Sequence, residues 1–435
     1  MSSNSNKRQV VVTGIGLISP LGNGRQEFYE SIKSGRSGVG KIDSETQHVA
    51  KYGIGAEVKD FDEKTLKKNF FKEKEQKKSI KVMCREIQMG AAAALMALED
   101  SQLDLDSFDH TRMGIDFGAN LMYYPPETLA GACKACVDGT GEFNSNLWGD
   151  LGLKEMEPLW MLKYLPNMPA CHIGIFTDSR GPNNSVTLDE ASPGVALTEA
   201  LNILERGSAE VMIVGGTGTR LHSMRTLQSR LWDDVGFDET NPSASCKPFD
   251  KNRNGQAIAE AAGSLILEEE EHAKARGATI YGKLLAGGSS CVVDTNGVGD
   301  STRSVVNSMN AALKRAGISV SDLGHINSHG IGTVADDAAE AKAYQELLGG
   351  ASIPVAALKG ATGNAGAGNG FLELTASLLS VADGVIPPAI HTKSFDEDLG
   401  FDLVVDQPRA TSNKIFANVN FAKVGQSSAA IFEAP

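Results

Sequence analysis

Short apolar runs alternate along the chain with stretches in which apolar residues recur every three or four positions. The runs are typical of buried strands, and the longer stretches are typical of amphipathic helices. In the first half, the predicted strands lie at residues 10–16, 181–188, 211–216 and 261–267, and the predicted helices at 25–34, 83–98, 193–204 and 268–276. In the second half, the predicted strands lie at 279–285, 325–328, 355–358, 403–405, 414–418 and 429–432, and the predicted helices at 304–316, 337–348 and 371–382. This alternation predicts an α/β fold of packed layers with largely parallel sheets. Both halves place a glycine-bearing turn after an apolar strand, which predicts an internal duplication.

One strand-to-helix turn, Gly181–Gly194, organises the rest of the chain. Ser192 fits the N-cap of the following helix, and Pro193 fits its first helical position. A side chain on this turn lies at the positive end of the helix dipole, where anions and thiolates are favoured. Many enzymes place a nucleophile there. This chain offers Asp189 and Glu190, and no Cys or Ser nucleophile unless Ser192 serves. The function must therefore be explained with a carboxylate at that turn.

Composition narrows the class of protein. The 435 residues are 41% hydrophobic and 22% charged, as in an ordinary soluble protein of two packed halves or one large α/β unit. The net charge of -13 argues against a nucleic-acid binder. No apolar run is long enough to cross a membrane, and the polar start, residues 1–8, has no apolar core of a signal peptide. The six scattered cysteines are typical of a reducing compartment, so we expect a cytoplasmic protein.

Two short motifs carry little functional signal. Cys133 and Cys136 form a single C-x-x-C with no second pair or nearby His, so we expect two thiols on a helix face and no metal site. Gly14 and Gly16 hint at a phosphate loop, but Ser19 stands where the third glycine of a dinucleotide fingerprint would fall. We therefore expect no nucleotide site.

Residues 59–81 are dense in lysine and glutamate, on a protein that is acidic overall. One interpretation is a solvated helix face with pairs of opposite charge four residues apart. The other is a basic docking surface for an acidic partner, formed by Lys74, Lys77 and Lys78. Beyond the next helix, residues 123–160 are irregular and punctuated by Gly and Pro, which predicts a long surface or interface excursion.

Three polar stretches of the second half are candidates for a functional site. His329 follows a buried strand and precedes a glycine, so it is placed to face a cleft, although a buried structural histidine is the plainer alternative. A glycine-rich stretch from Lys359 through Asn364 leads to Glu373, and its glycines let backbone pack closely against backbone or a ligand. A turn between the last two strands contains Phe421 and Lys423.

These stretches resemble, in order along the chain, β-ketoacyl-acyl-carrier-protein synthases of the elongating kind. The resemblance covers nearly the whole chain and rests on VVVTGIGLISPLGN, KEQKK, GPNNSV, VMIVGG, PFDKNRNG, LILEEEEHAKARGA, INSHGIGTVADDAAE, LKGATGN and the final strands. It implies the thiolase fold, in which two duplicated α/β halves, here residues 1–262 and 263–435, form a layered αβαβα arrangement.

The departures from the family fall in its active site. In the family, the organising turn carries a nucleophilic Cys that accepts the acyl chain. Aligned through Gly181 and Ser185, that position falls on Glu190, or on Ala191 if the extra residue near Pro193 is placed earlier.

The resemblance also assigns roles to the second half. The first family His is kept as His329 and the second is replaced by Asn364, while the family Lys and Glu are kept as Lys359 and Glu373. The gate beside the Cys is a Gly-Phe-Gly-Gly turn in the family and reads Ala-Lys-Val-Gly here, with Lys423 inside it. Of the two threonines that hold the phosphopantetheine arm, one is replaced by Ile331 and the other is kept as Thr333. Phe421, Lys423 and Thr333 are the expected substrate-binding residues.

These departures imply that the chain alone does not condense acyl groups. Condensation needs a thiolate that carries the acyl group, and a carboxylate would form a mixed anhydride far more reactive than the thioester. The first hypothesis is therefore a non-condensing partner of an active ketosynthase, like the chain-length factors of type II polyketide systems. The alternatives are a malonyl-carrier-protein decarboxylase, in which His329 and Asn364 stabilise the enolate, and a divergent 3-oxoacyl-acyl-carrier-protein synthase that uses Ser192 or a remote Cys.

Four further expectations follow from the resemblance. Glu190 and Lys423 should form an ion pair that plugs the acyl site. Lys74, Lys77 and Lys78 coincide with the docking patch for acyl carrier protein. The thiolase fold pairs through the strand at residues 185–187, so a homodimer or a heterodimer is expected. No metal or organic cofactor is implied beyond the phosphopantetheine arm of the carrier.

Overall fold

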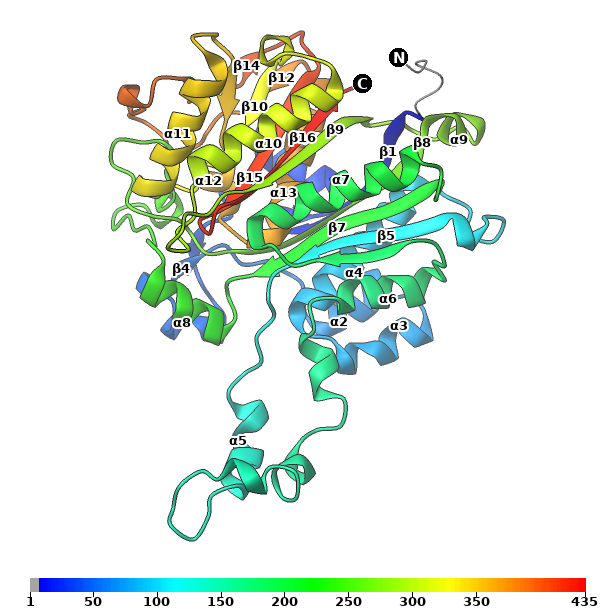
Figure 1. Cartoon of the computed structure of the whole chain (residues 1–435), viewed down its shortest axis with the longest axis vertical. Helices are drawn as coiled ribbons and strands as arrows, with labels where there is room; N and C mark the ends of the chain where they lie inside the picture. Colours follow the sequence, from blue (N-terminus) through cyan, green and yellow to red (C-terminus); the bar gives the residue numbers. More distant parts are fainter. Residues whose placement is uncertain (1–7) are drawn as a thin grey trace.

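A long mixed sheet runs through the computed structural model, which describes residues 8–435 (Figure 1). The strand order is β13-β11-β10-β15-β16-β9-β1-β8-β7-β5-β6, with β2 paired to β1, and two small sheets consist of β3 with β4 and β12 with β14. The strands are β1 (Val10–Ser19), β2 (Gly22–Asn23), β3 (Gly40–Lys41), β4 (Ile54–Gly55), β5 (Met113–Ala119), β6 (Asn183–Val186), β7 (Val211–Thr219), β8 (Glu260–Glu269), β9 (Gly282–Cys291), β10 (His325–Asn327), β11 (Pro354–Ala356), β12 (Val385–Ile386), β13 (Asp402–Leu403), β14 (Arg409–Ala410), β15 (Ile415–Ala422) and β16 (Gln426–Glu433).

The two halves repeat one strand pattern. In the first half, β1 is antiparallel to β8, β8 is antiparallel to β7, β7 is parallel to β5, and β5 is parallel to β6. In the second half, β9, β16, β15, β10 and β11 follow in the same order with the same directions. This repeat agrees with the predicted duplication. The expectation of largely parallel sheets was wrong. In each half, the first strand (β1 or β9) is antiparallel to the last strand (β8 or β16), and the last strand is also antiparallel to the strand before it in the chain (β7 or β15).

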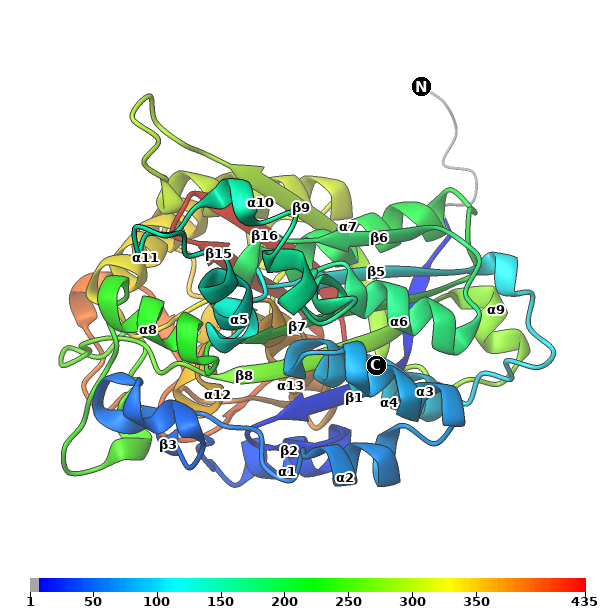
Figure 2. The same ribbon diagram turned by 90° about the horizontal axis from the view of Figure 1, so that it is seen from below.

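Five layers stack on one another, as the resemblance implies. α7 and α13 lie between the two halves of the sheet, α4 and α6 cover the outer face of the first half, and α10 and α11 cover the outer side of the second (Figures 1 and 2). The α-helices are α1 (Arg25–Lys33), α2 (Glu63–Thr65), α3 (Lys74–Ser79), α4 (Arg85–Ser101), α5 (Glu127–Ala135), α6 (Met168–Thr177), α7 (Ser192–Glu205), α8 (Ser223–Trp232), α9 (Glu270–Ala275), α10 (Ser301–Ala316), α11 (Val334–Leu348), α12 (Lys359–Thr362) and α13 (Asn369–Ala382). Within residues 8–435, no helix combines the length and apolarity needed to span a bilayer.

The two halves of the sheet meet along a short seam. Only Val10–Val12 of β1 pair with Gly282–Leu284 of β9. The predicted boundary between residues 262 and 263 falls inside β8 and stays a prediction.

Gly14 and Gly16 lie inside β1, where they allow α4 to pack directly on the strand. A Cβ atom at Gly14 would lie 2.1 Å from the carbonyl oxygen of Ala97, and one at Gly16 would lie 2.0 Å from that of Ala93. Close packing of a helix therefore accounts for this glycine pair without a phosphate.

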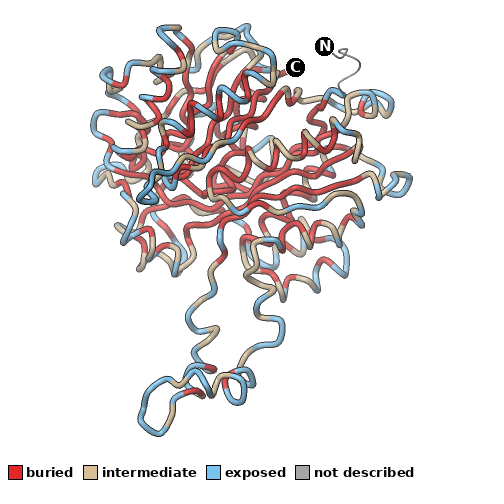
Figure 3. Tube along the Cα trace, in the orientation of Figure 1, coloured by how far each residue is buried: buried red, intermediate tan, exposed pale blue. Residues whose placement is uncertain are grey.

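Two segments stand apart from the layers. The lysine-rich segment does not form one helix but a series of short ones, α2, a π-helical turn at Leu66–Phe70, α3 and a 3-10 turn at Ile80–Val82. The predicted excursion is found after β5, where α5 and several 3-10 turns project from the body of the molecule and are largely exposed (Figure 3).

Candidate functional site

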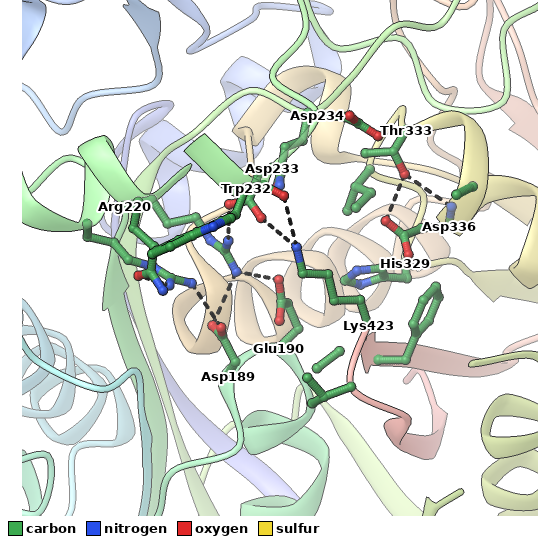
Figure 4. A pocket seen from close by; sticks show the side chains of 18 residues that line it. Asp189, Glu190, Arg220, Trp232, Asp233, Asp234, His329, Thr333, Asp336 and Lys423 are labelled. Carbon is green, nitrogen blue, oxygen red and sulfur yellow. Dashed lines mark hydrogen bonds and ion pairs between the residues drawn. The ribbon is translucent and has the colours of Figure 1, made fainter. Parts of the chain in front are cut away.

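A pocket of about 480 Å³ opens where the two halves of the molecule meet, and five of the predicted site residues, Glu190, His329, Thr333, Phe421 and Lys423, line it (Figure 4). Its walls come from the turn before α7, the end of β7, the end of α8, the loop after β10, the start of α11 and the β15–β16 turn. The lining residues are Asp189, Glu190, Arg220, Arg225, Gln228, Trp232, Asp233, Asp234, Gln256, His329, Ile331, Thr333, Ala335, Asp336, Phe421, Ala422, Lys423 and Val424.

The organising turn is tighter than the sequence indicates. Asp189 adopts a left-handed backbone conformation with φ of 47°, a 3-10 turn covers Asp189–Ala191, and α7 begins at Ser192. The prediction that Ser192 is the N-cap was wrong, because Ser192 is already helical and its buried hydroxyl accepts the Leu188 N–H at 2.8 Å. This bond ties the turn back on itself and directs the carboxylates of Asp189 and Glu190 into the pocket wall.

Glu190 is a nearly buried acid, with 8% of its surface exposed. Its Oε1 accepts hydrogen bonds from the guanidinium of Arg220 and, at 3.1 Å, from Nδ2 of Asn364. Burial and the neighbouring Asp189 raise the pKa of Glu190, while Arg220 and Asn364 act in the opposite direction. Ala191 is buried and is not part of the pocket wall, so the pocket meets the carboxylate.

Arg220 holds this wall together, and sequence reasoning missed it. It follows β7 directly, and only 4% of its side chain is exposed. Besides Glu190, its guanidinium lies 3.2 Å from Asp189 Oδ1 and 3.7 Å from Asp233 Oδ2. Although burial alone would lower the pKa of Arg220, these three carboxylates raise it above its usual range. The available signal was a charged residue at the end of an apolar strand, the same signal that drew attention to His329.

The predicted ion pair between Glu190 and Lys423 is not formed. Lys423 Nζ lies 2.9 Å from Asp233 Oδ1 and also donates to the carbonyl oxygen of Trp232 at 3.3 Å. The prediction was wrong because Arg220 already occupies the buried side of Glu190. Lys423 is 58% exposed at its side chain and lies at the rim of the pocket.

The opposite wall is built on backbone hydrogen bonds to two buried acids of α11. Glu340 accepts the N–H groups of His329 at 2.7 Å and Gly330 at 2.8 Å. Asp337 accepts those of Ile331 at 3.1 Å and Gly332 at 3.0 Å. These bonds fix the loop after β10 and therefore the direction of the His329 side chain.

Lys359 connects His329 to a buried ion pair. Its ammonium pairs with Glu373 and donates to the carbonyl oxygen of His329 at 2.7 Å, and it lies 3.3 Å from Nδ1 of the same residue. Asn420 donates to the other oxygen of Glu373 at 2.7 Å. Burial first, then the charges of Lys359 and Arg220, hold the pKa of His329 well below its usual value. An ammonium next to Nδ1 favours the tautomer with the proton on Nε2, so His329 is a neutral donor.

Asn364 joins the two walls. Its amide nitrogen donates to Glu190 and, at 2.7 Å, to Oε1 of Gln256, and its Oδ1 accepts the N–H of Gly366 at 3.0 Å. Both amide protons of Asn364 are therefore already used within the protein. Gly366 has φ of +70°, which suits glycine, and a Cβ there would meet Asn120 and Asp189 at 2.4 Å.

The remaining predicted residues divide into those at the pocket and those outside it. Phe421 packs on His329 with ring centroids 4.4 Å apart, and Thr333 lines the pocket while its hydroxyl caps α11 through Asp336. Lys74, Lys77 and Lys78 are exposed on α3 and do not line the pocket.

Other candidate nucleophiles are poorly suited to thioester exchange. Burial raises the pKa of the Cys84 and Cys246 thiols to about 12, so the thiolate is scarce at neutral pH. The hydroxyl of Ser192 is fully buried behind the turn.

The chain is similar to known proteins both in sequence and in structure. The model of the β-ketoacyl synthase N-terminal domain matches residues 7–273, and that of the C-terminal domain matches residues 284–393. The chain is 30% identical over 418 residues to 3-oxoacyl-acyl-carrier-protein synthase 2 of Synechocystis sp., covering 94% of each chain. It is 29% identical to the protein of the same name from Vibrio cholerae, covering 98% of this chain and 99% of that one.

Solved structures agree over nearly the whole length. The ishigamide ketosynthase/chain length factor superposes with a TM-score of 0.82 at 24% identity, covering 99% of this chain and 100% of that one, a likeness that shows the fold. A type II PKS acyl-carrier protein in complex with its ketosynthase bound to the hexaketide gives a TM-score of 0.80 at 25% identity, with 99% and 100% covered.

Proposed function

Because this chain belongs to the β-ketoacyl synthase family, we propose that it is a non-condensing member that works as the chain-length-factor-like partner of an active ketosynthase. In this role the chain shapes and supports a heterodimer, while the partner's Cys carries the acyl chain. The acyl carrier protein would bring substrates to the pair.

The observation that carries this proposal is the Glu190–Arg220 pair. The turn that holds the nucleophile in the family presents a carboxylate, and that carboxylate is held by a buried guanidinium and an amide. A group that accepts two hydrogen bonds and faces a cation is a poor nucleophile, and its acyl product would be an anhydride. Ser192 is buried, burial raises the pKa of the Cys84 and Cys246 thiols, and none of the six cysteines lines the pocket.

The electrostatics of the pocket also favour a silent site. Its lining contains five carboxylates, Asp189, Glu190, Asp233, Asp234 and Asp336, against three cations, Arg220, Arg225 and Lys423. An excess of acid groups repels the malonyl carboxylate and the phosphate of a phosphopantetheine arm.

The decarboxylase alternative has one observation in its favour. Neutral His329 lines the pocket and can donate from Nε2 toward a thioester oxygen. Its expected second donor, Asn364, spends both amide protons on Glu190 and Gln256, so one donor would have to stabilise the enolate alone. We therefore rank this activity second.

A divergent 3-oxoacyl-acyl-carrier-protein synthase is the third candidate. Relatives with that name are 29–30% identical to this chain, which favours shared substrates. It would require a nucleophile that the pocket does not supply.

Carrier docking and pairing belong to the same proposal. Lys74, Lys77 and Lys78 are exposed on α3, and among residues 8–435 their one ion pair is a long one, between Lys78 and Glu75 at 3.9 Å. They can meet an acidic carrier. Reversing all three charges should weaken carrier binding at least tenfold, and unchanged binding would remove this patch.

Intact-mass spectrometry of malonyl-loaded carrier protein, incubated with the purified chain, tests the site. We expect an unchanged malonyl mass. Conversion to acetyl-carrier would establish the decarboxylase instead, with His329→Ala as the variant that should abolish it.

A paired assay tests the partner role. The chain would be co-purified with a Cys-bearing ketosynthase, and elongation would be measured with Glu190→Gln in this chain and, separately, Cys→Ala in the partner. We expect elongation to survive the first change and to stop with the second. Elongation by this chain alone, or loss of elongation with the first change only, would contradict the proposal.

A further inference from the structure

The cations that line the pocket are Arg220, Arg225 and Lys423, and all three are already paired. Their partners are three of the five carboxylates in the same lining, Asp189, Glu190 and Asp233. Within residues 8–435, the lining therefore offers an anionic ligand no unpaired cation.

The other two carboxylates of the lining, Asp234 and Asp336, have no cationic partner in the described part of the chain. Asp234 is exposed, whereas Asp336 is partly buried and accepts a hydrogen bond of 2.8 Å from the hydroxyl of Thr333. Burial raises the pKa of Asp336, and the charges of Asp234 and Asp233 add to this effect. The Thr333 bond and the charge of Lys423 act in the opposite direction. A cation beside Asp234 and Asp336 would relieve the repulsion between them.

The acidic surface continues beyond the pocket. A second cavity of about 420 Å³ shares Ala335, Asp336 and Lys423 with the first and adds Asp294 and Asp300 to its lining. The ion pairs found among residues 8–435 include neither of these added acids. A cleft lined by one sign of charge raises the local concentration of ligands of the opposite sign.

A buried hydrogen-bond donor points into the same pocket. His329 lines it with only 2% of its surface exposed (Figure 4). Its Nδ1 lies beside the Lys359 ammonium, whereas its Nε2 has no hydrogen-bond partner among residues 8–435. The protonated Nε2 can therefore donate to an acceptor oxygen of a bound molecule. His329 lies in the loop after β10 and Asp336 in the first turn of α11, so both belong to one wall.

The rest of the lining suits an organic cation better than a metal ion. Within the part of the chain that the structure describes, no three or more His, Cys, Asp or Glu side chains form a group that could hold a metal ion. Trp232, Phe421 and Val424 give the pocket apolar surface, and Trp232 is 69% exposed. An indole face attracts an ammonium group, and apolar side chains pack against the carbon chain that carries it.

We propose that the pocket binds an aminoacyl group, with its primary ammonium at Asp336 and Asp234 and its carbonyl oxygen at Nε2 of His329. The ammonium supplies the positive charge that the two acids lack, and the carbonyl oxygen accepts the unused proton of His329. The same acids repel an acyl group that ends in a carboxylate. The inference rests on the proposed function only for its use, because a non-condensing chain would hold this group without reacting with it.

Three amides of equal length test the ligand class on the full chain. They are ε-aminocaproamide, caproamide and adipamate, which end in an ammonium, a methyl group and a carboxylate. By isothermal titration calorimetry, we expect the ammonium compound to bind at least tenfold more tightly than the other two. Asp336→Asn should weaken its binding at least tenfold and leave caproamide unchanged.

Two further variants and a control sharpen the assignment. Asp234→Asn changes an exposed residue and serves if Asp336→Asn fails to fold, as judged by its melting temperature; it should weaken ε-aminocaproamide at least threefold. His329→Phe should weaken ε-aminocaproamide and leave hexylamine, which has no carbonyl, unchanged. Asp398→Asn, an exposed acid on a distant 3-10 turn, is the matched control and should change none of these affinities.

Carrier proteins loaded with ε-aminocaproyl or caproyl groups identify the source of the ligand. Tighter binding of the aminoacyl carrier assigns a carrier-borne group, and equal binding of both carriers, with the free amide still bound, assigns a free molecule.

Equal binding of the three amides, no binding of the ammonium compound, or an undiminished preference for it in both aspartate variants would overturn the inference. Elongation by this chain alone, together with the preference for the ammonium compound, would count against the proposed function and leave the ligand class standing. Elongation that needs the partner's Cys, together with equal binding of the amides, would do the reverse.

Discussion

The two walls of the pocket come from the two halves of the chain, and they differ in how their charged groups are held. On the second-half side, His329, Lys359 and Glu373, the residues to which the resemblance assigns roles, are tied into one buried network. On the first-half wall, the turn before α7 presents Glu190, where the resemblance leads us to expect the family Cys, and Arg220 is buried beside it. The comparison teaches that the two walls depend on their ion pairs to different degrees, because the Lys359–Glu373 pair is fully buried and cannot lose one member cheaply, whereas Glu190 faces the pocket.

The strongest test of this difference is Lys359→Met, which removes the cation from the second-half wall. It leaves Glu373 charged and fully buried, so we expect the free energy of unfolding to fall by about 3–5 kcal/mol. Urea denaturation measures the change. The double variant with Glu373→Gln should recover most of the loss, and a wild-type stability for Lys359→Met would mean that the network is dispensable.

Arg220→Met makes the corresponding change on the first-half wall. Glu190 faces the pocket and can take up a proton, so the expected loss is smaller, about 2–3 kcal/mol. Combining it with Glu190→Gln should restore part of the stability. A loss equal to that of Lys359→Met would erase the difference between the two walls.

The walls should respond to pH with opposite signs. The pKa of Glu190 is raised, so its contribution to stability is present below its unfolded pKa of about 4.5 and is lost as the pH rises through the folded pKa. The pKa of His329 is lowered, so its contribution is present above its unfolded pKa of about 6.5 and is lost as the pH falls. Relative to the wild type, Glu190→Gln should therefore gain stability from pH 5 to 8, and His329→Asn should gain it from pH 7 to 5. Unfolding free energies at each pH decide the matter, and the same sign for both variants would contradict the assignment.

Lys423→Met should have the smallest effect. Its pair with Asp233 is exposed on the lysine side, and such pairs contribute about 0–1 kcal/mol. We expect a melting temperature close to that of the wild type, with Lys78→Met as an exposed control. A large loss would return Lys423 to the role of a buried plug for Glu190.

Much of the fold could be predicted from periodicity alone, because apolar strands such as β7 and amphipathic helices such as α10 carry their own signals. Strand direction could not be predicted, because β1 pairs with β8, the last strand of the first half, and no local sequence pattern encodes that contact. The site divides in the same way. His329, Lys359 and Glu373 were found because they lie in recognisable stretches, and the structure brings them together.

The partner of Glu190 could not be read from the chain for a geometric reason. Arg220 follows β7, Lys423 lies in the turn that joins β15 to β16, and both are cations. Only the packing of β7 against the organising turn decides which of the two reaches Glu190. The predicted position of the N-cap, Ser192, was wrong by one residue, which is the usual uncertainty of a helix start.

The pairing of β1 has a consequence for how the molecule is made. Val10 of β1 pairs with Glu269, roughly 260 residues later in the chain. At a synthesis rate of about 5–20 residues per second, this apolar ten-residue strand, paired until then only with the two-residue β2, waits about 13–50 s for β8. Chains interrupted before residue 260 leave the β8 edge of β1 unpaired, so we expect incomplete translation products of this protein to need chaperones.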